Sequence, residues 1–356
     1  MSPDAAAPDL RVEALVSGRL VASSRFRVLQ HVAPLGRLGV EVSARPPRIS
    51  KYASVPGRWA RRPGLAPAAR LALQGAKLAT RLPSAARSWR ADVTWLEREV
   101  LPGHQTLEPL LHRPVLFDVD DAIWLLSAGH ERAARAVAAR AACVLAGNDF
   151  LADWFAAVAP AVERVWTAVD TDRFTPGPRR DRPFVAGWTG SGSSLRYLRA
   201  VAPAIARFLA EAPDARLVVM ADAFVSLPGI PDDRVDLVPW SPGHEASALQ
   251  AFDVGLMPLL GGDWAKGKCA FKMLQYMACA VPAVVSPVGM NAEVLAMGDV
   301  GLPATTEDEW VEALLTVYRD RDRAVALGRR GRELAERSFS VPVIAPQLAA
   351  AMRRYR

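Results

Sequence analysis

Short apolar segments alternate with longer stretches in which apolar residues recur at helical spacing along the whole chain. This alternation predicts βαβ units, in which parallel strands form a sheet and helices cover both of its faces. The predicted strands are 11–16, 40–44, 92–96, 114–119 and 142–146 in the first half, and 184–188, 216–220, 235–238, 254–257 and 283–285 in the second. The sequence therefore predicts an α/β protein with two Rossmann-like, doubly wound domains.

A dense run of proline, glycine and charged residues separates the two sets of strands. It lies between Pro176 and Arg182, and such a composition is typical of an interdomain linker. We expect one domain over 1–176 and another over 177–338, facing each other across a cleft at the carboxyl ends of both sheets, where ligands of such sheets bind. The remaining residues, 339–356, predict a basic amphipathic helix that packs back toward the N-terminal domain.

Composition narrows the class of protein. Half of the 356 residues are hydrophobic, yet no window approaches the roughly 20 unbroken apolar residues of a membrane span. The start of the chain has no apolar segment typical of a secretory signal, and the three cysteines, Cys143, Cys269 and Cys279, predict buried thiols in a reducing compartment. We therefore expect a cytoplasmic protein. The five histidines have no metal-ligand spacing, so no metal site is expected.

The net charge of +7 is unevenly distributed. Residues 42–91 contain no Asp or Glu, but eleven Lys and Arg interleaved with Trp59 and Trp89. Such a segment, here 45–90, suits an anionic membrane surface, which would place the protein peripherally on the inner face of the membrane. A solvated basic face without a partner remains the alternative. No nucleic acid is expected, because no recognised binding motif accompanies the charge.

A Gly/Ser-rich loop follows the first predicted strand of the second half and precedes a predicted helix over 195–208. Glycine lets the backbone approach a ligand closely, and N–H groups at a helix start attract anions. Serine hydroxyls can cap the helix or bind a phosphate oxygen. The alternative is an ordinary turn. The candidate residues of this loop are Gly190, Ser191, Gly192, Ser193 and Ser194.

A second loop brings Lys266, Lys268 and Lys272 to the start of another predicted helix. Fixed cations there add to the positive end of the helix dipole, and the combination suits a diphosphate. Lysines on a solvated helix end are the alternative. Lys272 is less easily explained in that way, because it lies between Phe271 and Met273.

Residues 268–285 resemble the donor-binding helix and the following strand of glycosyltransferase family 4, the retaining "group 1" transferases of the GT-B fold. Residues 23–29, 147–151, 167–176, 253–259 and 286–293 are similar to other parts of that family, so the likeness extends from Ser23 to Phe339. It implies a nucleoside diphosphate sugar as donor, no metal or other cofactor, and an acceptor site mainly in the first domain.

The resemblance also assigns roles to residues. It implies catalytic roles for Lys268 and Lys272, donor contacts for Cys269, Ala270, Phe271 and Gln275 beside the Gly/Ser loop, and acceptor-side contacts for Ser24, Arg25, Arg27, Trp124 and Asn148. The family has two glutamates eight positions apart that hold the sugar hydroxyls and the ribose. This chain has Gly267 and Gln275 there. An amide can still hydrogen-bond a ribose hydroxyl, whereas glycine has no side chain to do so.

Three carboxylates, Asp118, Asp120 and Asp121, end a predicted strand. Such crowding raises at least one pKa unless cations neutralise it. The transferase resemblance implies catalytic roles for Asp120 and Asp121 at the mouth of the cleft, holding a sugar hydroxyl or receiving the acceptor's proton. Alternatively, the Asp-Val-Asp run resembles haloacid-dehalogenase-type phosphohydrolases, with Asp118 as nucleophile and Asp120 as acid/base beside magnesium. A structural role for Asp118, capping the next turn, is a third alternative.

These features together predict a retaining, metal-independent glycosyltransferase that acts on a glycan, a lipid-linked molecule or another cell-envelope acceptor. Negative charge develops on the departing diphosphate, so the amides around residues 191–194 and the two lysines would stabilise the transition state. A second class stays open, since the absence of both glutamates is compatible with a non-catalytic protein that binds a nucleotide or a glycan.

Overall fold

The computed structural model describes residues 8–62, 64–178, 182–224 and 226–356. The chain divides into two compact units: Met1–Thr167 with Ile344–Arg356 form unit 1, and Ala168–Val343 form unit 2. This division falls upstream of the boundary predicted at residue 176. Part of the predicted linker, residues 179–181, lies outside the described residues.

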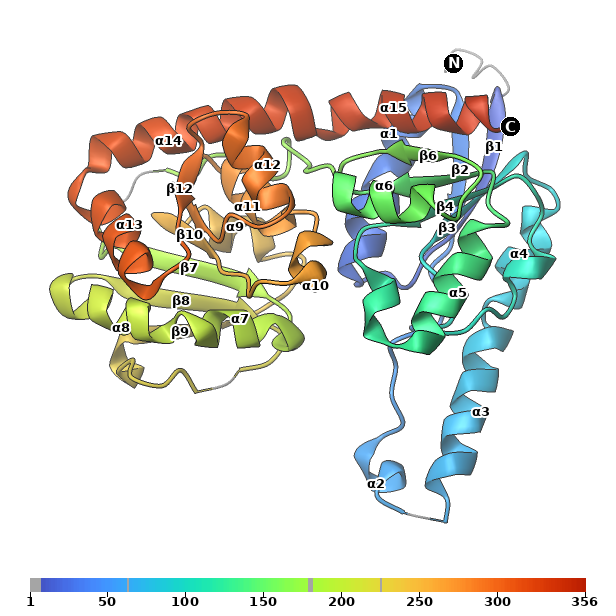
Figure 1. The fold of residues 1–356 in the computed structure, drawn as a ribbon, viewed down its shortest axis with the longest axis horizontal. Helices are drawn as coiled ribbons and strands as arrows, with labels where there is room; N and C mark the ends of the chain where they lie inside the picture. The colour runs from blue at the N-terminus through green and yellow to red at the C-terminus, as the bar shows by residue number, and fades with distance from the viewer. Residues whose placement is uncertain (1–7, 63, 179–181, 225) are drawn as a thin grey trace, which may run out of the picture. The chain divides into compact units, whose positions relative to one another are not determined.

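Unit 1 is built on a six-stranded parallel sheet with the strand order β2-β1-β3-β4-β5-β6 (Figure 1). Each strand pairs in register with its neighbour, so the carboxyl ends of the strands form one edge of the sheet. The strands are β1 (Leu10–Leu15), β2 (Val40–Ala44), β3 (Val93–Glu97), β4 (Val115–Val119), β5 (Cys143–Ala146) and β6 (Val162–Arg164).

Helices connect the strands of unit 1, and α2 and α3 extend away from its sheet (Figure 1). The α-helices are α1 (Val32–Arg37), α2 (Gly57–Ala60), α3 (Ala66–Ala79), α4 (Leu82–Ser88), α5 (Ala128–Ala138), α6 (Asp149–Ala156) and α15 (Val341–Arg354). Short η segments cover Ser24–Val28, Leu29–His31, Glu108–Leu110 and Ile123–Leu126. Most of α15 belongs to unit 1 although it is last in sequence.

Unit 2 contains a second six-stranded parallel sheet, in the order β12-β11-β10-β7-β8-β9. Counted from the first strand of the unit, this is the 3-2-1-4-5-6 order of dinucleotide-binding folds. The strands are β7 (Val185–Gly190), β8 (Arg216–Ala221), β9 (Val235–Pro239), β10 (Val254–Met257), β11 (Ala283–Val285) and β12 (Gly301–Pro303).

The helices of unit 2 include one break that the sequence analysis missed. The predicted helix over 195–208 consists of α7 and α8, which are interrupted at Val201 because Pro203 begins a new helix. The α-helices are α7 (Leu195–Ala200), α8 (Ala202–Glu211), α9 (Glu245–Leu249), α10 (Asp263–Lys266), α11 (Phe271–Ala278), α12 (Met290–Ala296), α13 (Glu307–Arg319) and α14 (Arg321–Leu334), with η segments at Gly192–Ser194, Asp232–Arg234 and Ala335–Phe339.

Two parallel, helix-connected sheets confirm the predicted fold class. All ten predicted strands are present, within two residues at each end. The prediction missed β6 and β12, which contain only three residues each and lie at the outer edges of their sheets. Such short segments carry too little hydrophobic pattern to be recognised.

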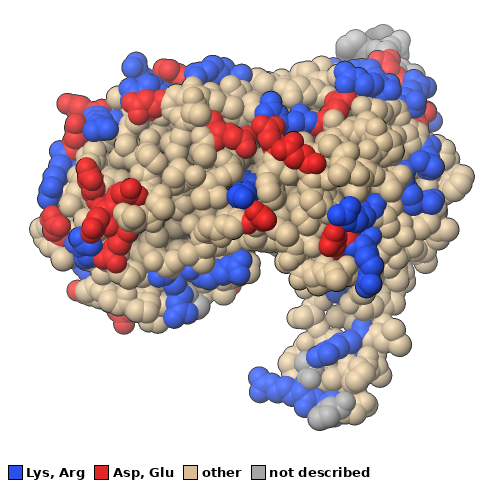
Figure 2. Space-filling view, in the orientation of Figure 1, with Lys and Arg blue, Asp and Glu red and all other residues tan. Residues whose placement is uncertain are grey.

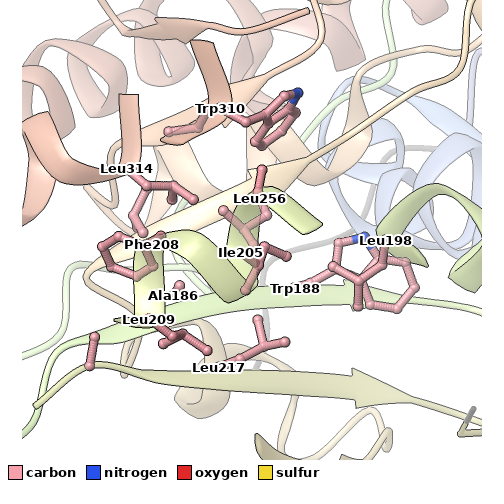
Figure 3. Packing of buried hydrophobic residues seen from close by; sticks show 14 of the residues in the cluster. Ala186, Trp188, Leu198, Ile205, Phe208, Leu209, Leu217, Leu256, Trp310 and Leu314 are labelled. Carbon is pink, nitrogen blue, oxygen red and sulfur yellow. The ribbon is translucent and has the colours of Figure 1, made fainter. Parts of the chain in front are cut away.

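The core of unit 2 explains how its functional loops are held. Leu256 of β10 faces α8 and α13, where Ile205, Phe208 and Trp310 pack against the sheet (Figure 3). The neighbouring residue Gly255 faces the opposite side, since side chains alternate along a strand. A Cβ at Gly255 would lie 2.4 Å from the ring of Tyr276 in α11. The absence of a side chain on β10 therefore lets α11 pack directly against the sheet.

Replacing Gly255 by alanine tests this close packing. We expect Gly255→Ala to lower the free energy of unfolding of unit 2 by about 1–3 kcal/mol, because the new methyl group must displace the Tyr276 ring. Urea unfolding followed by circular dichroism would measure the change. Gly261→Ala is the matched control, since a Cβ there meets nothing within 4 Å and should change stability by less than about 0.5 kcal/mol. Equal stability of the two variants would contradict the packing argument.

Candidate functional site

The two predicted loops of unit 2 meet at the carboxyl edge of its sheet. Gly190 is the last residue of β7 rather than part of the loop, and a Cβ added to it would lie 3.0 Å from the Cε of Lys272. The ammonium of Lys272 lies 5.8 Å from the centroid of the Trp188 ring. The start of α11 therefore lies against the end of β7, and this edge carries a fixed cation.

The Gly/Ser loop is not an open set of amides. The Gly192 N–H donates to the carboxylate of Asp222 at 2.5 Å. The contact of this loop with a phosphate stays a prediction. The Ser191 hydroxyl lies 2.9 Å from that of Ser193 and 3.3 Å from that of Ser194. Asp222 is exposed and follows β8 directly, so a negative charge borders the predicted anion site.

The loop before α11 is fixed by backbone packing. Ala270, which precedes α11, is fully buried and adopts the left-handed conformation with φ +50°. Alanine has no side-chain acceptor, so Ala270 leaves the N–H groups of the first turn uncapped by its own side chain. Gly289, at φ +55°, approaches so closely that a Cβ would lie 2.6 Å from the carbonyl oxygen of Lys266. The segment that follows β10 and carries Lys268 and Cys269 therefore packs against the loop that follows β11.

Gln275, the predicted ribose-binding residue, is buried and points its amide at a carboxylate. Its Nε2 donates to Oε1 of Glu245 at 3.3 Å. Glu245 also accepts from Trp240 at 3.2 Å and from Arg173 at 2.9 Å. These contacts fix the direction of the amide, because its nitrogen must face Glu245 and its oxygen must face away. The contact of Gln275 with a ribose stays a prediction.

In unit 1, the acidic cluster at the end of β4 is neutralised by arginines. Asp118 is fully buried, and Arg27 donates to its Oδ1 at 2.7 Å while Trp95 donates to Oδ2 at 3.1 Å. Burial raises the pKa of Asp118, and Arg27 opposes that rise. A carboxylate enclosed in this way has no path to a phosphorus atom. The burial of Asp118 therefore argues against the phosphohydrolase alternative.

Asp120 and Asp121 share one partner that the sequence analysis did not identify. Arg98, which follows β3, donates from Nε to Asp120 at 2.6 Å and from Nη2 to Asp121 at 2.6 Å. The pKa of Asp120 is raised to about 6, because burial, Asp121 and Glu97 together raise it by more than Arg98 lowers it. A carboxyl group with this pKa can exchange a proton near neutral pH.

The predicted acceptor-side residues mostly hold structural positions. Ser24 donates to the buried carboxylate of Glu97 at 2.7 Å. Asn148 caps α6 by accepting from the Leu151 N–H at 2.9 Å. Trp124 stacks on Trp154, with ring centroids 4.1 Å apart. Of this predicted set, Arg25 alone is not buried. Contacts of all these residues with an acceptor stay predictions.

The sequence contains a recognisable pattern for some of the site residues that were not predicted from it. Glu97 and Arg98 directly follow a predicted strand, in the same way as Asp118 to Asp121, and the parallel pairing of β3 with β4 brings both strand ends together. Asp222 likewise follows a strand of unit 2. Glu245 carried no such signal, because only tertiary packing brings it to Gln275. In the described part of the chain, no group of three or more His, Cys, Asp and Glu is arranged to hold a metal ion.

Comparison with known families finds a match within unit 2. Residues 185–320, which lie within unit 2, match the family model described as "Glycosyl transferases group 1". Unit 2 therefore contains a region that is similar to the group 1 glycosyltransferases. The matched region contains the Gly/Ser loop, both predicted catalytic lysines and Gln275. No curated protein sequence matches the transferase significantly.

Solved structures agree with the fold over nearly the whole transferase. HepE from Anabaena, in complex with UDP and glucose, matches with a TM-score of 0.71 at 14% identity and covers 97% of this chain and 100% of its own. Sucrose-phosphate synthase from Thermosynechococcus elongatus matches with a TM-score of 0.71 at 15% identity, and the match covers 97% of this chain and 98% of the synthase. WaaG, a glycosyltransferase involved in lipopolysaccharide biosynthesis, matches with a TM-score of 0.65 at 12% identity, and the match covers 96% of this chain and 99% of WaaG. At these identities the likeness establishes the GT-B fold alone.

The pKa of Asp120 predicts a pH-dependent stability of the transferase. A folded-state pKa of about 6, above the ordinary value of an aspartate, gives stability that is present below about pH 4 and lost as the pH rises through about 6. We expect the difference in unfolding free energy between Asp120→Asn and the parent protein to change in favour of the variant by about 1–3 kcal/mol between pH 4 and pH 7. Urea unfolding from pH 4 to 8 would measure it. Asp153→Asn, an exposed change in the same unit, should show no such trend, and a flat difference for Asp120→Asn would refute the assignment.

Restoring the glutamate at position 275 is expected to harm this transferase. Gln275→Glu would place a second carboxylate within hydrogen-bond distance of Glu245, so we expect a loss of about 1–3 kcal/mol in unfolding free energy at pH 7, which shrinks toward pH 4 as one carboxyl group protonates. Adding Glu245→Gln should recover part of the loss, and a double-mutant cycle measures the coupling. Additive effects in that cycle would mean that the two side chains do not interact.

Proposed function

We propose that the chain transfers a sugar, with retention of configuration and without a metal ion, from a nucleoside diphosphate sugar to a glycan, a lipid-linked molecule or another cell-envelope acceptor. Unit 2 would hold the donor, and unit 1 would present the acceptor. The observation that carries this proposal is the approach of the Lys272 side chain to Gly190, which brings the start of α11 against the end of β7, directly before the Gly/Ser loop.

The chemistry follows from the charges at this edge. When the glycosidic bond to the diphosphate breaks, negative charge accumulates on the leaving phosphate. Lys268 and Lys272 would neutralise it, and the N–H groups at the start of α11 point in the same direction as the positive end of the helix dipole. Asp222 adds a negative charge nearby, so the lysines are needed to make the site attractive to an anion.

The acceptor would meet Asp120 and Asp121 in unit 1. A carboxylate with a pKa near 6 is suited to hold an acceptor hydroxyl and to take up its proton as the new bond forms. Arg98 would act through these two carboxylates by orienting them, and it is therefore a positioning residue. Arg25 would contact the acceptor from the neighbouring loop.

One observation favours a non-catalytic alternative. Gly267 and Gln275 stand where the family has glutamates, and the Gln275 amide is engaged by Glu245. A chain that binds a nucleotide sugar without transferring it would share these features. Calorimetry with UDP-, GDP- and ADP-sugars, followed by a turnover assay, separates the two: binding without any transfer or donor hydrolysis would favour the binding protein.

We also propose a location for the transferase. It would lie in the cytoplasm and associate peripherally with the inner face of the membrane through the basic segment 45–90. Within the described residues, no helix combines the length and the apolar character that a bilayer span requires.

Substitution of the two lysines tests the mechanism. We expect Lys268→Ala and Lys272→Ala each to lower kcat by about 10- to 1000-fold, because each removes a charge that stabilises the leaving diphosphate. Donor hydrolysis or transfer would be measured. Lys266→Ala is the matched control: its ammonium pairs with Asp263 at 2.9 Å on the exposed side of α10, so the rate should change less than about threefold. Near-normal rates in both lysine variants would remove them from the mechanism.

A further inference from the structure

An arm, residues 51–81, leaves unit 1 after β2 and returns before α4. It contains α2 and α3, which extend away from the sheet (Figure 1). Its root is held by buried cations that donate to main-chain carbonyls: Lys51 to Glu99 at 2.9 Å, and Lys77 to Lys51 at 2.8 Å. Arg81 donates to the Ser17 carbonyl at 3.2 Å. The root is therefore fixed to the loops that follow β1 and β3.

The outer part of the arm, residues 56–76, has a different character. Trp59, Leu65 and Leu71 are 41%, 46% and 76% exposed. No residue from 67 to 75 is buried, so this part of α3 lies largely in solvent. A helix of this length is only marginally stable when it lacks packing. An uncovered helix that displays leucine and tryptophan indicates a surface that is completed by a partner.

The charge of the outer arm is of one sign. Arg61, Arg62 and Arg70 are exposed, and the guanidinium of Arg62 lies 5.8 Å from the Trp59 ring. The sequence of the arm contains no Asp or Glu, and the face shown in Figure 2 carries Lys and Arg on this projection without acidic side chains. The partner must therefore be anionic as well as able to cover aliphatic and indole side chains.

We propose that the outer arm docks on an anionic lipid bilayer. Trp59, Leu65 and Leu71 would enter the boundary between headgroups and acyl chains, where tryptophan and leucine are favoured. The arginines would meet lipid phosphates while their aliphatic stems remain among the apolar side chains. This inference deepens the proposed membrane association and rests on it, since it names the elements and side chains that make the contact.

A bilayer explains the composition better than a nucleic acid does. Within residues 56–76 the one neutral polar side chain that can hydrogen-bond, apart from Trp59, is Gln74. Nucleic-acid surfaces need polar side chains that contact bases and sugars as well as phosphates. The arm instead combines arginine with leucine, alanine, proline and tryptophan, which is the composition of an interfacial membrane segment.

The root of the arm is linked by hydrogen bonds to the proposed acceptor site of unit 1. Tyr52, beside Lys51, accepts from Arg98 Nη1 at 3.3 Å, and Arg98 holds Asp120 and Asp121. The root of the arm is thereby connected through hydrogen bonds to the proposed acceptor carboxylates. A lipid-linked acceptor would reach unit 1 from the same bilayer.

Flotation with vesicles tests the proposal on the full chain. With equal parts of phosphatidylcholine and phosphatidylglycerol, the protein should float, and added salt should weaken the association. Replacing Arg61, Arg62 and Arg70 together by Gln should lower the partition coefficient by about 100-fold, since each cation contributes about fivefold. The triple change Trp59→Ala, Leu65→Ser and Leu71→Ser should lower it by at least about tenfold.

A matched control lies on α14, where Arg323, Val325 and Arg329 are exposed. The changes Arg323→Gln, Val325→Ser and Arg329→Gln alter the same kinds of side chain and should leave flotation unchanged. Circular dichroism and thermal melting would verify that every variant folds. A fluorophore on Leu71→Cys should show a blue shift with anionic vesicles, which provides a readout independent of the triple variants.

Three results would overturn the proposal: equal flotation with pure phosphatidylcholine, a loss in the arm variants no larger than in the control, or binding of the arm to double-stranded DNA without flotation. Flotation uses no donor sugar, and transfer to a water-soluble acceptor uses no vesicles. Failure of the docking proposal and failure of the proposed transferase chemistry are therefore observed in separate experiments.

Discussion

Arg98 stands where the ends of β3 and β4 meet, and its guanidinium contacts Asp120, Asp121 and the hydroxyl of Tyr52. Its backbone has φ +54°, a conformation that non-glycine residues rarely adopt and that the surrounding contacts must stabilise. Carboxylates this close together in a buried position would repel each other strongly without a cation between them. The edge of the first sheet depends on this interaction.

The same constraint of buried charge extends through unit 1. Glu97 accepts from the Ser17 N–H and from the Ser24 hydroxyl. Burial acts to raise its pKa, but Lys51, Arg98 and hydrogen bonds lower it below its usual value. Lys51 and Arg81, which help to fix the root of the arm, are part of this neutralisation. The basic arm and the acidic edge therefore belong to one electrostatic arrangement, in which the sequence supplies the cations on one segment and the carboxylates on others.

In unit 2, the packing of α11 on the sheet brings a cation, Lys272, to the end of a strand. Tyr276 packs on Gly255, and its hydroxyl donates to the Leu256 carbonyl at 3.1 Å and accepts from the Thr189 N–H at 3.3 Å. These contacts set the position of α11, so Lys272 reaches Gly190. The Gln275–Glu245 pair lies one residue before Tyr276 and explains why an amide suits this position better than a carboxylate.

The sequence by itself determined the fold class, ten of the twelve strands found in the described residues, the free and buried cysteines, and the loops that carry the lysines and the acidic cluster. These features are local, because they depend on hydrophobic periodicity and on residues that follow a strand directly. Only the tertiary structure decided that Arg98 neutralises Asp120 and Asp121, that Asp222 takes the Gly192 amide, and that Glu245 meets Gln275. Such pairs join residues that are 22 to 30 positions apart. Their partners are chosen by strand order and helix packing, which hydrophobic periodicity does not encode.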